Sequence, residues 1–358
     1  MSTISFLVGS YSIPSPWAGA PGAHGAGIVA AELDTASGAV YVWSSRFEIN
    51  PSFLVRTLAA GLVWGITEPE KGGDLLAFRQ DASGGLDPIG RLKTGADAPC
   101  HVAIHPTRQF AFIAHYHGGA VALLALDGAG TPAAVLDLVR PPTIVGNQDR
   151  SASSPRPHAV LPLNDNELIV TDAGRDQVLL YRLDMERARP SLELLQGLAL
   201  QTGTGPRHLA RAPREGLFYV SNQNSTGISI IERVAGDEGP RVVLRGVLSD
   251  PGLGRAVPVP SEIAVHSAGR VCYLANRMDE SLSIFSIEAG SGDLEPIGAI
   301  DVMGKNPRHF AIAPGGEWLL VANQDSGDLT VFRIEDDGRR VVRTGGRIAV
   351  SSPTVVAF

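Results

Sequence analysis

The sequence predicts an all-β protein, a seven-bladed β-propeller with four antiparallel strands in each blade. Two observations lead to this prediction: one stretch recurs along the chain, and its last copy is completed by the N-terminus. Residues 204–231 typify the stretch, TGPRHLARAPREGLFYVSNQNSTGISII, which contains three short strands separated by turns. A strand that leads through a polar turn directly into another strand is typical of an antiparallel meander.

Copies of this stretch begin about 50 residues apart, close to the roughly 40 to 50 residues of a four-stranded propeller blade. We align them on six anchor residues, Pro51, Pro99, Arg156, Pro206, Pro260 and Pro307. A length of 358 residues alone would suggest two or three domains, but the repeat is the stronger evidence. Because a lone blade cannot bury both of its faces, we expect a single domain over residues 1–358.

The two ends of the chain are expected to share one blade. Residues SSPTVVAF supply a seventh anchor at Pro353 but only one strand. The N-terminal SFLVGSYS matches the second strand of the preceding copy, with Ser10 where that copy has Asn323. Pairing of the N- and C-terminal strands would close the ring and remove the gap between its first and last blades.

Composition limits the kinds of molecule that the protein is expected to bind and its expected location in the cell. The net charge of -7 argues against nucleic acid as a general partner. No apolar run is long enough to span a membrane, and the N-terminus lacks the basic and apolar regions of a signal peptide. We therefore expect a cytoplasmic protein in which Cys100 and Cys272 are buried free thiols. Nothing in the sequence indicates an oligomeric state.

Two loops stand out between the predicted strands. Residues 13–27 are rich in Gly and Pro, but they lack the Lys and Ser/Thr of a phosphate loop, so we interpret them as a surface loop and expect no cofactor. Residues 141–157 form the longest insertion. Polar, Pro-broken loops of this length in compact folds often have a function, so this loop is a candidate to cover a site.

A functional site is expected at one mouth of the central channel. The loop entering the first strand of a blade and the turn between its second and third strands lie at the same end. Arg207 and Arg308 directly follow their anchors, and the turns contribute Glu68, Gln223 and Arg277. The residues two positions after the anchors are Phe53, His101, His158, His208, Glu262, His309 and Val355.

Arginines gathered at a channel mouth repel one another unless an anion or an acid offsets them. We therefore predict that Arg207 and Arg277 bind a small anionic molecule. Any one of the histidines could instead satisfy a carbonyl between blades. His115 and His117 have a spacing that could suit a metal, but carboxylates are sparse in the predicted ring, so we expect no metal.

The segments GPRHLA…FYVSNQNST, PHAV…VTDAGRDQV and NPSFL resemble the seven-bladed propeller lactonase family over the whole chain. That family includes bacterial 6-phosphogluconolactonases and a fungal 3-carboxy-cis,cis-muconate lactonising enzyme. The resemblance implies active-site roles for His158, Arg207 and Arg277. It also shows two departures, Gln223 where the family has a glutamate and Val160 where members often have a second histidine.

The departure at Gln223 has a chemical consequence, because an amide cannot exchange a proton as a carboxylate does. Glu68 or Glu262 could take over that role. Our first hypothesis is a lactonase acting on an anionic sugar lactone. His158 would transfer protons, the arginines would hold the anion and stabilise the oxyanion, and His101, His208, Arg308 and His309 would line the substrate site. The alternatives are a carboxymuconate cycloisomerase and a non-catalytic propeller that binds an anionic metabolite or a protein.

Overall fold

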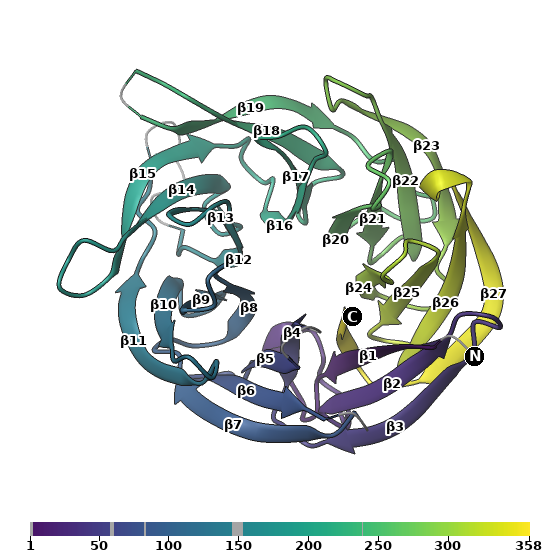
Figure 1. Ribbon diagram of the computed structural model, residues 1–358. Coiled ribbons are helices and arrows are strands. Elements are labelled where there is room, and N and C mark those ends of the chain that lie inside the picture. Colours follow the sequence, from purple (N-terminus) through teal and green to yellow (C-terminus); the bar gives the residue numbers. More distant parts are fainter. Residues whose placement is uncertain (1–2, 58–60, 82–83, 145–152, 238) are drawn as a thin grey trace.

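The computed structural model describes residues 3–57, 61–81, 84–144, 153–237 and 239–358. These residues form seven four-stranded antiparallel sheets arranged as a ring around a central axis, as predicted (Figure 1). The innermost strands all begin at a proline, which suits the first residue of a strand because proline has no N–H to donate. They are β28 (Pro353–Ala357), β4 (Pro51–Thr57), β8 (Pro99–Ile104), β12 (Pro157–Pro162), β16 (Pro206–Arg211), β20 (Pro260–Val265) and β24 (Pro307–Ile312).

The second and third strands of each blade are strongly apolar and buried on both faces. The second strands are β1 (Thr3–Ser10), β5 (Leu62–Thr67), β9 (Phe110–His115), β13 (Glu167–Asp172), β17 (Leu217–Asn222), β21 (Val271–Asn276) and β25 (Trp318–Asn323). The third strands are β2 (Ile28–Asp34), β6 (Asp74–Gln80), β10 (Ala120–Leu126), β14 (Gln177–Asp184), β18 (Ile228–Val234), β22 (Ser281–Ile287) and β26 (Asp328–Glu335).

The outermost strands carry one exposed face and form the outer wall of the ring. They are β3 (Val40–Arg46), β7 (Leu86–Lys93), β11 (Pro132–Val139), β15 (Ser191–Ala199), β19 (Arg241–Leu248), β23 (Leu294–Asp301) and β27 (Arg340–Ala349). The only helical turns among the described residues are the 3₁₀ turns η1 (Pro16–Ala18) and η4 (Asp336–Gly338). No helix in the described part of the chain is long and apolar enough to cross a membrane.

The ring closes through the two chain ends, as the sequence predicts. Strand β28 pairs antiparallel with β1, with Leu7 opposite Ala357 and Ser10 opposite Pro353. The rings of Phe6 and Phe358 lie in contact, with centroids 5.5 Å apart. Ser10 thus occupies the position that Asn323 holds opposite Pro307 in the neighbouring blade, which confirms the predicted alignment of the N-terminal strand.

The apolar core lies between blades rather than within them. Seven buried clusters each join two adjacent blades, and the cluster at the closure contains Phe6 and Val356 of one blade with Trp318 and Leu320 of the next. This arrangement follows from the flat shape of a blade, which buries its two faces only against its neighbours. Cys100 and Cys272 are buried free thiols within strands, as expected.

Candidate active site

The mouth of the channel, the end at which the innermost strands begin, is built by one backbone hydrogen bond repeated in all seven blades. The residue after the second strand donates its N–H to the carbonyl just before the first strand, as in the bond from Gln223 to Gly205. In the closing blade Tyr11 donates to Ser352, so the chain ends complete the pattern. These residues form the rim row, Tyr11, Glu68, Tyr116, Ala173, Gln223, Arg277 and Gln324.

A β-bulge after each leading proline re-aims the next residue of the innermost strand. The pairing with the second strand shifts by one residue at this point in every blade. Residues in the bulges form the bulge row, Ser52, Cys100, His158, Arg207, Ser261, Arg308 and Thr354. The next residues form the channel row, Phe53, His101, Ala159, His208, Glu262, His309 and Val355.

The pairing corrects the sequence alignment in one blade. Pro157, not Arg156, starts β12 and pairs with Asp172, because the hairpin that follows is one residue shorter than in the other blades. His158 therefore belongs to the bulge row with Arg207 and Arg308, whereas our alignment had placed it with His101, His208 and His309. Ala159 takes the place in the channel row.

The side chains of some bulge residues join neighbouring blades. Thr354 Oγ1 and Ser261 Oγ donate to carbonyls at the start of the next innermost strand, at 3.5 and 2.7 Å. In the two blades whose bulges hold His158 and Arg207, the second strand supplies this bond instead. Thr171 Oγ1 donates to the Arg207 carbonyl at 2.6 Å and Ser221 Oγ to the Ser261 carbonyl at 2.9 Å. The His158 and Arg207 side chains are thereby free for another task.

Arg207 and Arg277 are cations without an acid partner among the described residues. Arg207 is 3% exposed, and its Nε and Nη1 atoms are buried without a hydrogen-bond partner. Arg277 donates only to the amide oxygen of Gln223, at 3.5 Å, and its Nε is also unpartnered. Burial and the charge of Arg308 lower the pKa of Arg207 to about 10, while burial and the charge of Arg207 lower the pKa of Arg277 to about 9. Both shifts show that the surroundings disfavour the positive charge, which a bound anion would stabilise.

Arg308, by contrast, is already paired within the protein. It donates to Gln324 Oε1 at 3.1 Å and to the Tyr11 hydroxyl at 2.8 Å, and Tyr11 donates to Glu68 Oε2 at 2.9 Å. Burial raises the pKa of Glu68, and the charge of Arg308 opposes that shift. This chain of four side chains offsets the charge of Arg308 across three blades.

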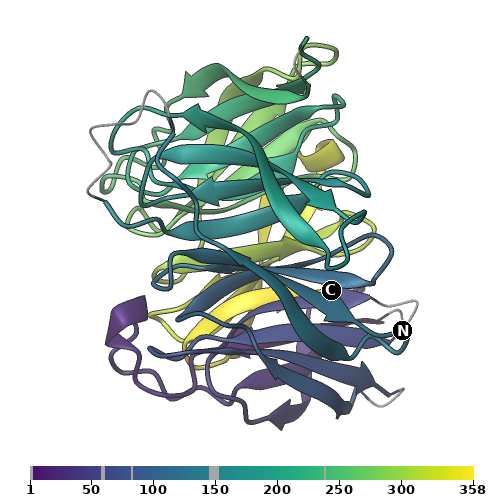
Figure 2. The same cartoon turned by 90° about the vertical axis from the view of Figure 1, so that its left-hand side faces the viewer.

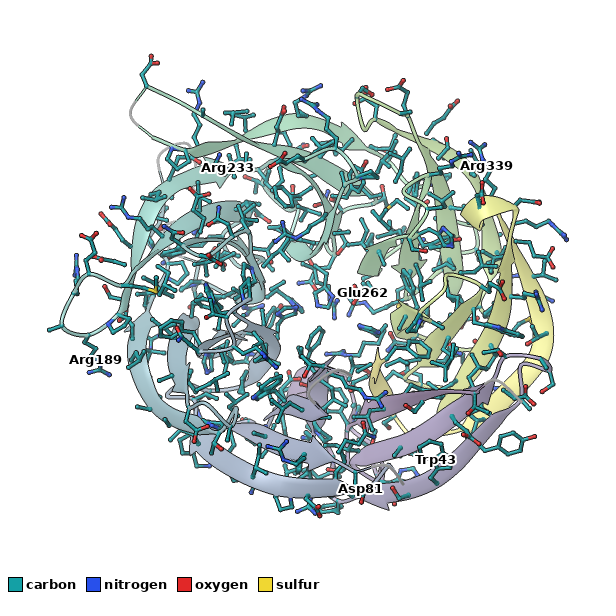
Figure 3. All side chains as sticks on the ribbon, viewed as in Figure 1. Trp43, Asp81, Arg189, Arg233, Glu262 and Arg339 are labelled. Carbon is teal, nitrogen blue, oxygen red and sulfur yellow. The ribbon has the colours of Figure 1, made fainter. Side chains whose placement is uncertain are left out.

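The channel row forms a tight cluster around Phe53. The Phe53 ring lies 4.2 Å from the His101 ring and 5.9 Å from the rings of both His208 and His309, measured between centroids. Glu262, at the inner edge of the ring (Figure 3), accepts from His208 Nδ1 at 2.7 Å and lies 3.1 Å from His309 Nε2. The cluster thus places a carboxylate and histidines directly below the bulge row.

The histidines at the site are held neutral. Burial, with a contribution from Arg207, lowers the pKa of His101 to about 3 and the pKa values of His158 and His208 well below their usual range. The His158 ring lies 5.3 Å from the His208 ring and 5.3 Å from the Tyr116 ring. At pH 7 these rings are therefore uncharged, and each has one nitrogen that can accept a hydrogen bond or, where a nearby anion raises its pKa, a proton.

A cavity of about 380 Å³ reaches the same cluster from the other end of the channel. Its walls are mainly apolar side chains from the later parts of β4, β8, β12 and β16. Phe53, His101, His208 and Glu262 are among the residues that line it.

Other candidate groups have structural tasks. The amide of Asn276 donates to Asp250, Ser281 and Ser283, and Asn323 makes similar bonds within its blade. Asp172 accepts from three backbone N–H groups and from Gln177. His115 contacts Thr94 and the Ala120 carbonyl rather than His117, so this pair does not form a metal site.

Sequence reasoning missed Tyr11 and the role of the first loop. Extending the N-terminal alignment by one residue past Ser10 would have placed Tyr11 in the rim row. The loop of residues 13–27 carries η1, which projects from one face of the ring in Figure 2. The Trp17 carbonyl lies 3.4 Å from His117 Nε2, and the Gly19 carbonyl accepts a hydrogen bond from Gln324 Nε2 at 3.1 Å. This loop, interpreted as an ordinary surface loop, therefore reaches the rim. Residues 145–152 of the other loop lie outside the described part.

The closed ring of seven four-stranded blades defines a β-propeller, and the neutral histidines and the arginines without an ion pair among the described residues at one mouth are its candidate small-molecule site. The family model described as "Lactonase, 7-bladed beta-propeller" matches residues 5–358, and the chain belongs to that family. This membership confirms the resemblance inferred from the sequence motifs.

Three relatives span nearly the whole chain. The 6-phosphogluconolactonase of Bacillus subtilis is 25% identical, covering 93% of this chain and 94% of the relative. The 6-phosphogluconolactonase of Formosa agariphila is 26% identical, covering 91% of each. The solved structure of the periplasmic gluconolactonase of Pseudomonas aeruginosa superposes with a TM-score of 0.86 at 26% identity, covering 99% of this chain and 98% of that structure.

Proposed function

We propose that the protein hydrolyses a sugar lactone that carries an anionic group, with 6-phosphogluconolactone as the favoured substrate. The observation that carries this proposal is the pair of guanidinium groups of Arg207 and Arg277 at the channel mouth, neither of which forms an ion pair among the described residues. The names of the relatives favour hydrolysis of a lactone over cyclisation of a carboxymuconate.

The two arginines suit different parts of the substrate. Arg277 lies on the rim row and is partly exposed, so it can meet a charge that the substrate already carries in solution. Arg207 is almost fully buried beside His158. A buried, preorganised donor of this kind stabilises the negative charge that develops on the substrate only in the transition state. We assign phosphate binding to Arg277 and oxyanion stabilisation to Arg207.

The reaction adds water to the lactone carbonyl carbon. The attacking water loses a proton, the carbonyl oxygen becomes an oxyanion facing Arg207, and the ring C–O bond then breaks. The ring oxygen takes up a proton to become a hydroxyl, and the new carboxylic acid ionises to release one proton to solvent. His158 and His208, the neutral histidines close to Arg207, are the candidates to remove and deliver these protons.

The test compares two lactones on the wild type and three variants by following acid release above the spontaneous rate. With 6-phosphogluconolactone, Arg277→Ala should raise KM by at least about 10-fold, whereas with unphosphorylated gluconolactone its KM should stay unchanged. Arg207→Ala should lower kcat by about 100-fold or more on both substrates. Exposed Arg339→Ala is the matched control. Wild-type turnover at the spontaneous rate, with binding of 6-phosphogluconate retained, would instead indicate a non-catalytic propeller.

The location and the charge of the substrate remain predictions. The expectation of a cytoplasmic location rests on the N-terminal residues and on the lack of a long apolar run in the sequence, and one relative carries "periplasmic" in its name. Fractionation of cells with an antibody against the protein would decide the location.

A further inference from the structure

We propose that His208 is the proton acceptor for the hydrolytic water and that Glu262, held in place by His309, is the positioning residue that fixes its tautomer. The inference rests on the proposed lactonase activity and names the group that removes the proton. Gln223 cannot do so, because its amide does not accept a proton at neutral pH.

The hydrogen-bond network assigns the proton of His309 first. The backbone N–H of Val356 donates to His309 Nδ1 at 3.4 Å, so this nitrogen carries no proton of its own. In a neutral imidazole the proton must then be on Nε2. His309 Nε2 lies 3.1 Å from Glu262 Oε2 and donates to it.

The same carboxylate oxygen fixes the tautomer of His208. His208 Nδ1 lies 2.7 Å from Glu262 Oε2. Burial raises the pKa of Glu262 and the charge of Arg207 opposes that shift, and in its ionised form the carboxylate only accepts hydrogen bonds. The proton of His208 is therefore on Nδ1, which leaves a free lone pair on Nε2. That nitrogen is buried and has no hydrogen-bond partner among the described residues, in a side chain that is 5% exposed.

A carboxylate that holds Nδ1–H and leaves Nε2 free is the arrangement that makes histidine an oriented general base. His158 lacks it, since its Nδ1 approaches only the thiol of Cys100, at 4.0 Å. The two imidazole rings lie 5.3 Å apart, so a water that His208 activates would be close to His158 and to the neighbouring Arg207. His208 and His158 are thus not equivalent.

The charged groups around His208 couple its basicity to the presence of substrate. Burial, Arg207, His101, His309 and Arg308 all lower the pKa of His208, and His158 and Glu262 also face it. A negative charge developing against Arg207 offsets that repulsion and raises the proton affinity of His208 as the water is deprotonated. The proton held on Nε2 then goes to the ring oxygen as the C–O bond breaks, which returns His208 to its neutral state.

The decisive variant is Glu262→Gln. The glutamine keeps an oxygen that accepts from His208 Nδ1 and His309 Nε2, but it removes the negative charge that stabilises the imidazolium formed when His208 takes the proton. For Glu262→Gln we expect kcat on 6-phosphogluconolactone to fall at least about 100-fold, with KM within about threefold of the wild-type value. The kcat of His208→Gln should fall by the same factor. The double variant should be no slower than either single one, because the two residues act as a unit. Exposed Glu317→Gln is the control and should match wild type.

A second measurement needs no activity and no variant. Nitrogen-15 NMR of the imidazole rings should show His208 of the wild-type protein protonated on Nδ1 and unprotonated on Nε2. An Nε2-protonated His208 in the wild type, or a kcat for Glu262→Gln within about threefold of wild type, would overturn the proposal. If the wild type showed no lactonase activity but the expected Nδ1 tautomer, the proposed function would fail while the tautomer assignment stood.

Discussion

The guanidinium of Arg308 donates a 2.8 Å hydrogen bond to the hydroxyl of Tyr11 and lies 5.2 Å from the centre of its ring, although the two residues belong to opposite ends of the chain. This contact joins the closure of the ring to the site at its mouth. It also distinguishes Arg308, which is offset by Tyr11 and Glu68, from the unpaired Arg207 and Arg277.

Removing the hydroxyl in Tyr11→Phe should therefore act on stability rather than on turnover. The change leaves buried Glu68 without its O–H donor, and we expect the free energy of unfolding to fall by about 1–3 kcal/mol. Because Arg308 is not assigned to the reacting groups, kcat should change less than about threefold. Urea unfolding and lactone kinetics measure the two effects, with exposed Tyr41→Phe as the control. A large fall in kcat with unchanged stability would place Arg308 in the chemistry.

Restoring the family glutamate in Gln223→Glu should not raise the rate. The side-chain oxygen lies 3.5 Å from Arg277, so a carboxylate there would neutralise the guanidinium that we assign to the phosphate. We expect KM for 6-phosphogluconolactone to rise by about 10-fold and kcat to stay within about threefold. An increase in kcat would show that a carboxylate at this position improves proton transfer and would weaken the assignment to His208.

The closing strand should be indispensable to the stability of the whole ring. Val356 is 3% exposed and lies in the core cluster shared with β25 and β26, so Val356→Asp buries a charge without a partner. We expect the free energy of unfolding to fall by more than about 3 kcal/mol. The control is Val257→Asp, which should lower it by less than about 0.5 kcal/mol because the side chain of Val257 is exposed. A single unfolding transition by fluorescence and circular dichroism would support the prediction of one domain over residues 1–358.

Acid should destabilise the protein through its buried neutral histidines. The pKa of His101 is lowered to about 3, whereas an unfolded histidine takes up a proton near pH 6.5. The unfolded state therefore binds more protons as the pH falls below 6.5, and the free energy of unfolding declines. Replacing His101 by Gln should reduce the decline between pH 7.0 and 5.5 by roughly 1 kcal/mol, measured in urea. Surface His24→Gln should leave it unchanged, and an equal decline in His101→Gln would contradict the prediction.

The repeat made most of the fold predictable, because each blade shares one set of local rules. A leading proline, an apolar second strand and a polar turn recur, and they predict strands such as β17 and β18 close to their observed bounds. The closure followed from a match between Ser10 and Asn323. Only the blade of His158 was misaligned, because Arg156 and Pro157 both fit the pattern and the shortened hairpin is visible only in the pairing of Pro157 with Asp172.

The composition of the site was predictable, but its pairings were not. The alignment placed Arg207, Arg277 and Glu262 at one end of the ring. It could not show that Glu262 accepts from His208 and His309, since these bonds depend on side-chain directions set by the bulges. Tyr11 was missed because its partners, Arg308 and Glu68, belong to other blades.

The pairing of β28 with β1 also sets the order of events during protein synthesis. The first blade remains without its innermost strand until the ribosome has extruded Pro353–Ala357, so β1 cannot gain its inner partner before the other six innermost strands have been made. Until then Phe6 and Val29 lack their contact with Val356 in the core cluster, and incompletely buried apolar side chains make a nascent chain prone to aggregate. Tyr11 directly follows β1, so a protein truncated before Pro353 would also lose the strand that orders the partner of Arg308 at the mouth.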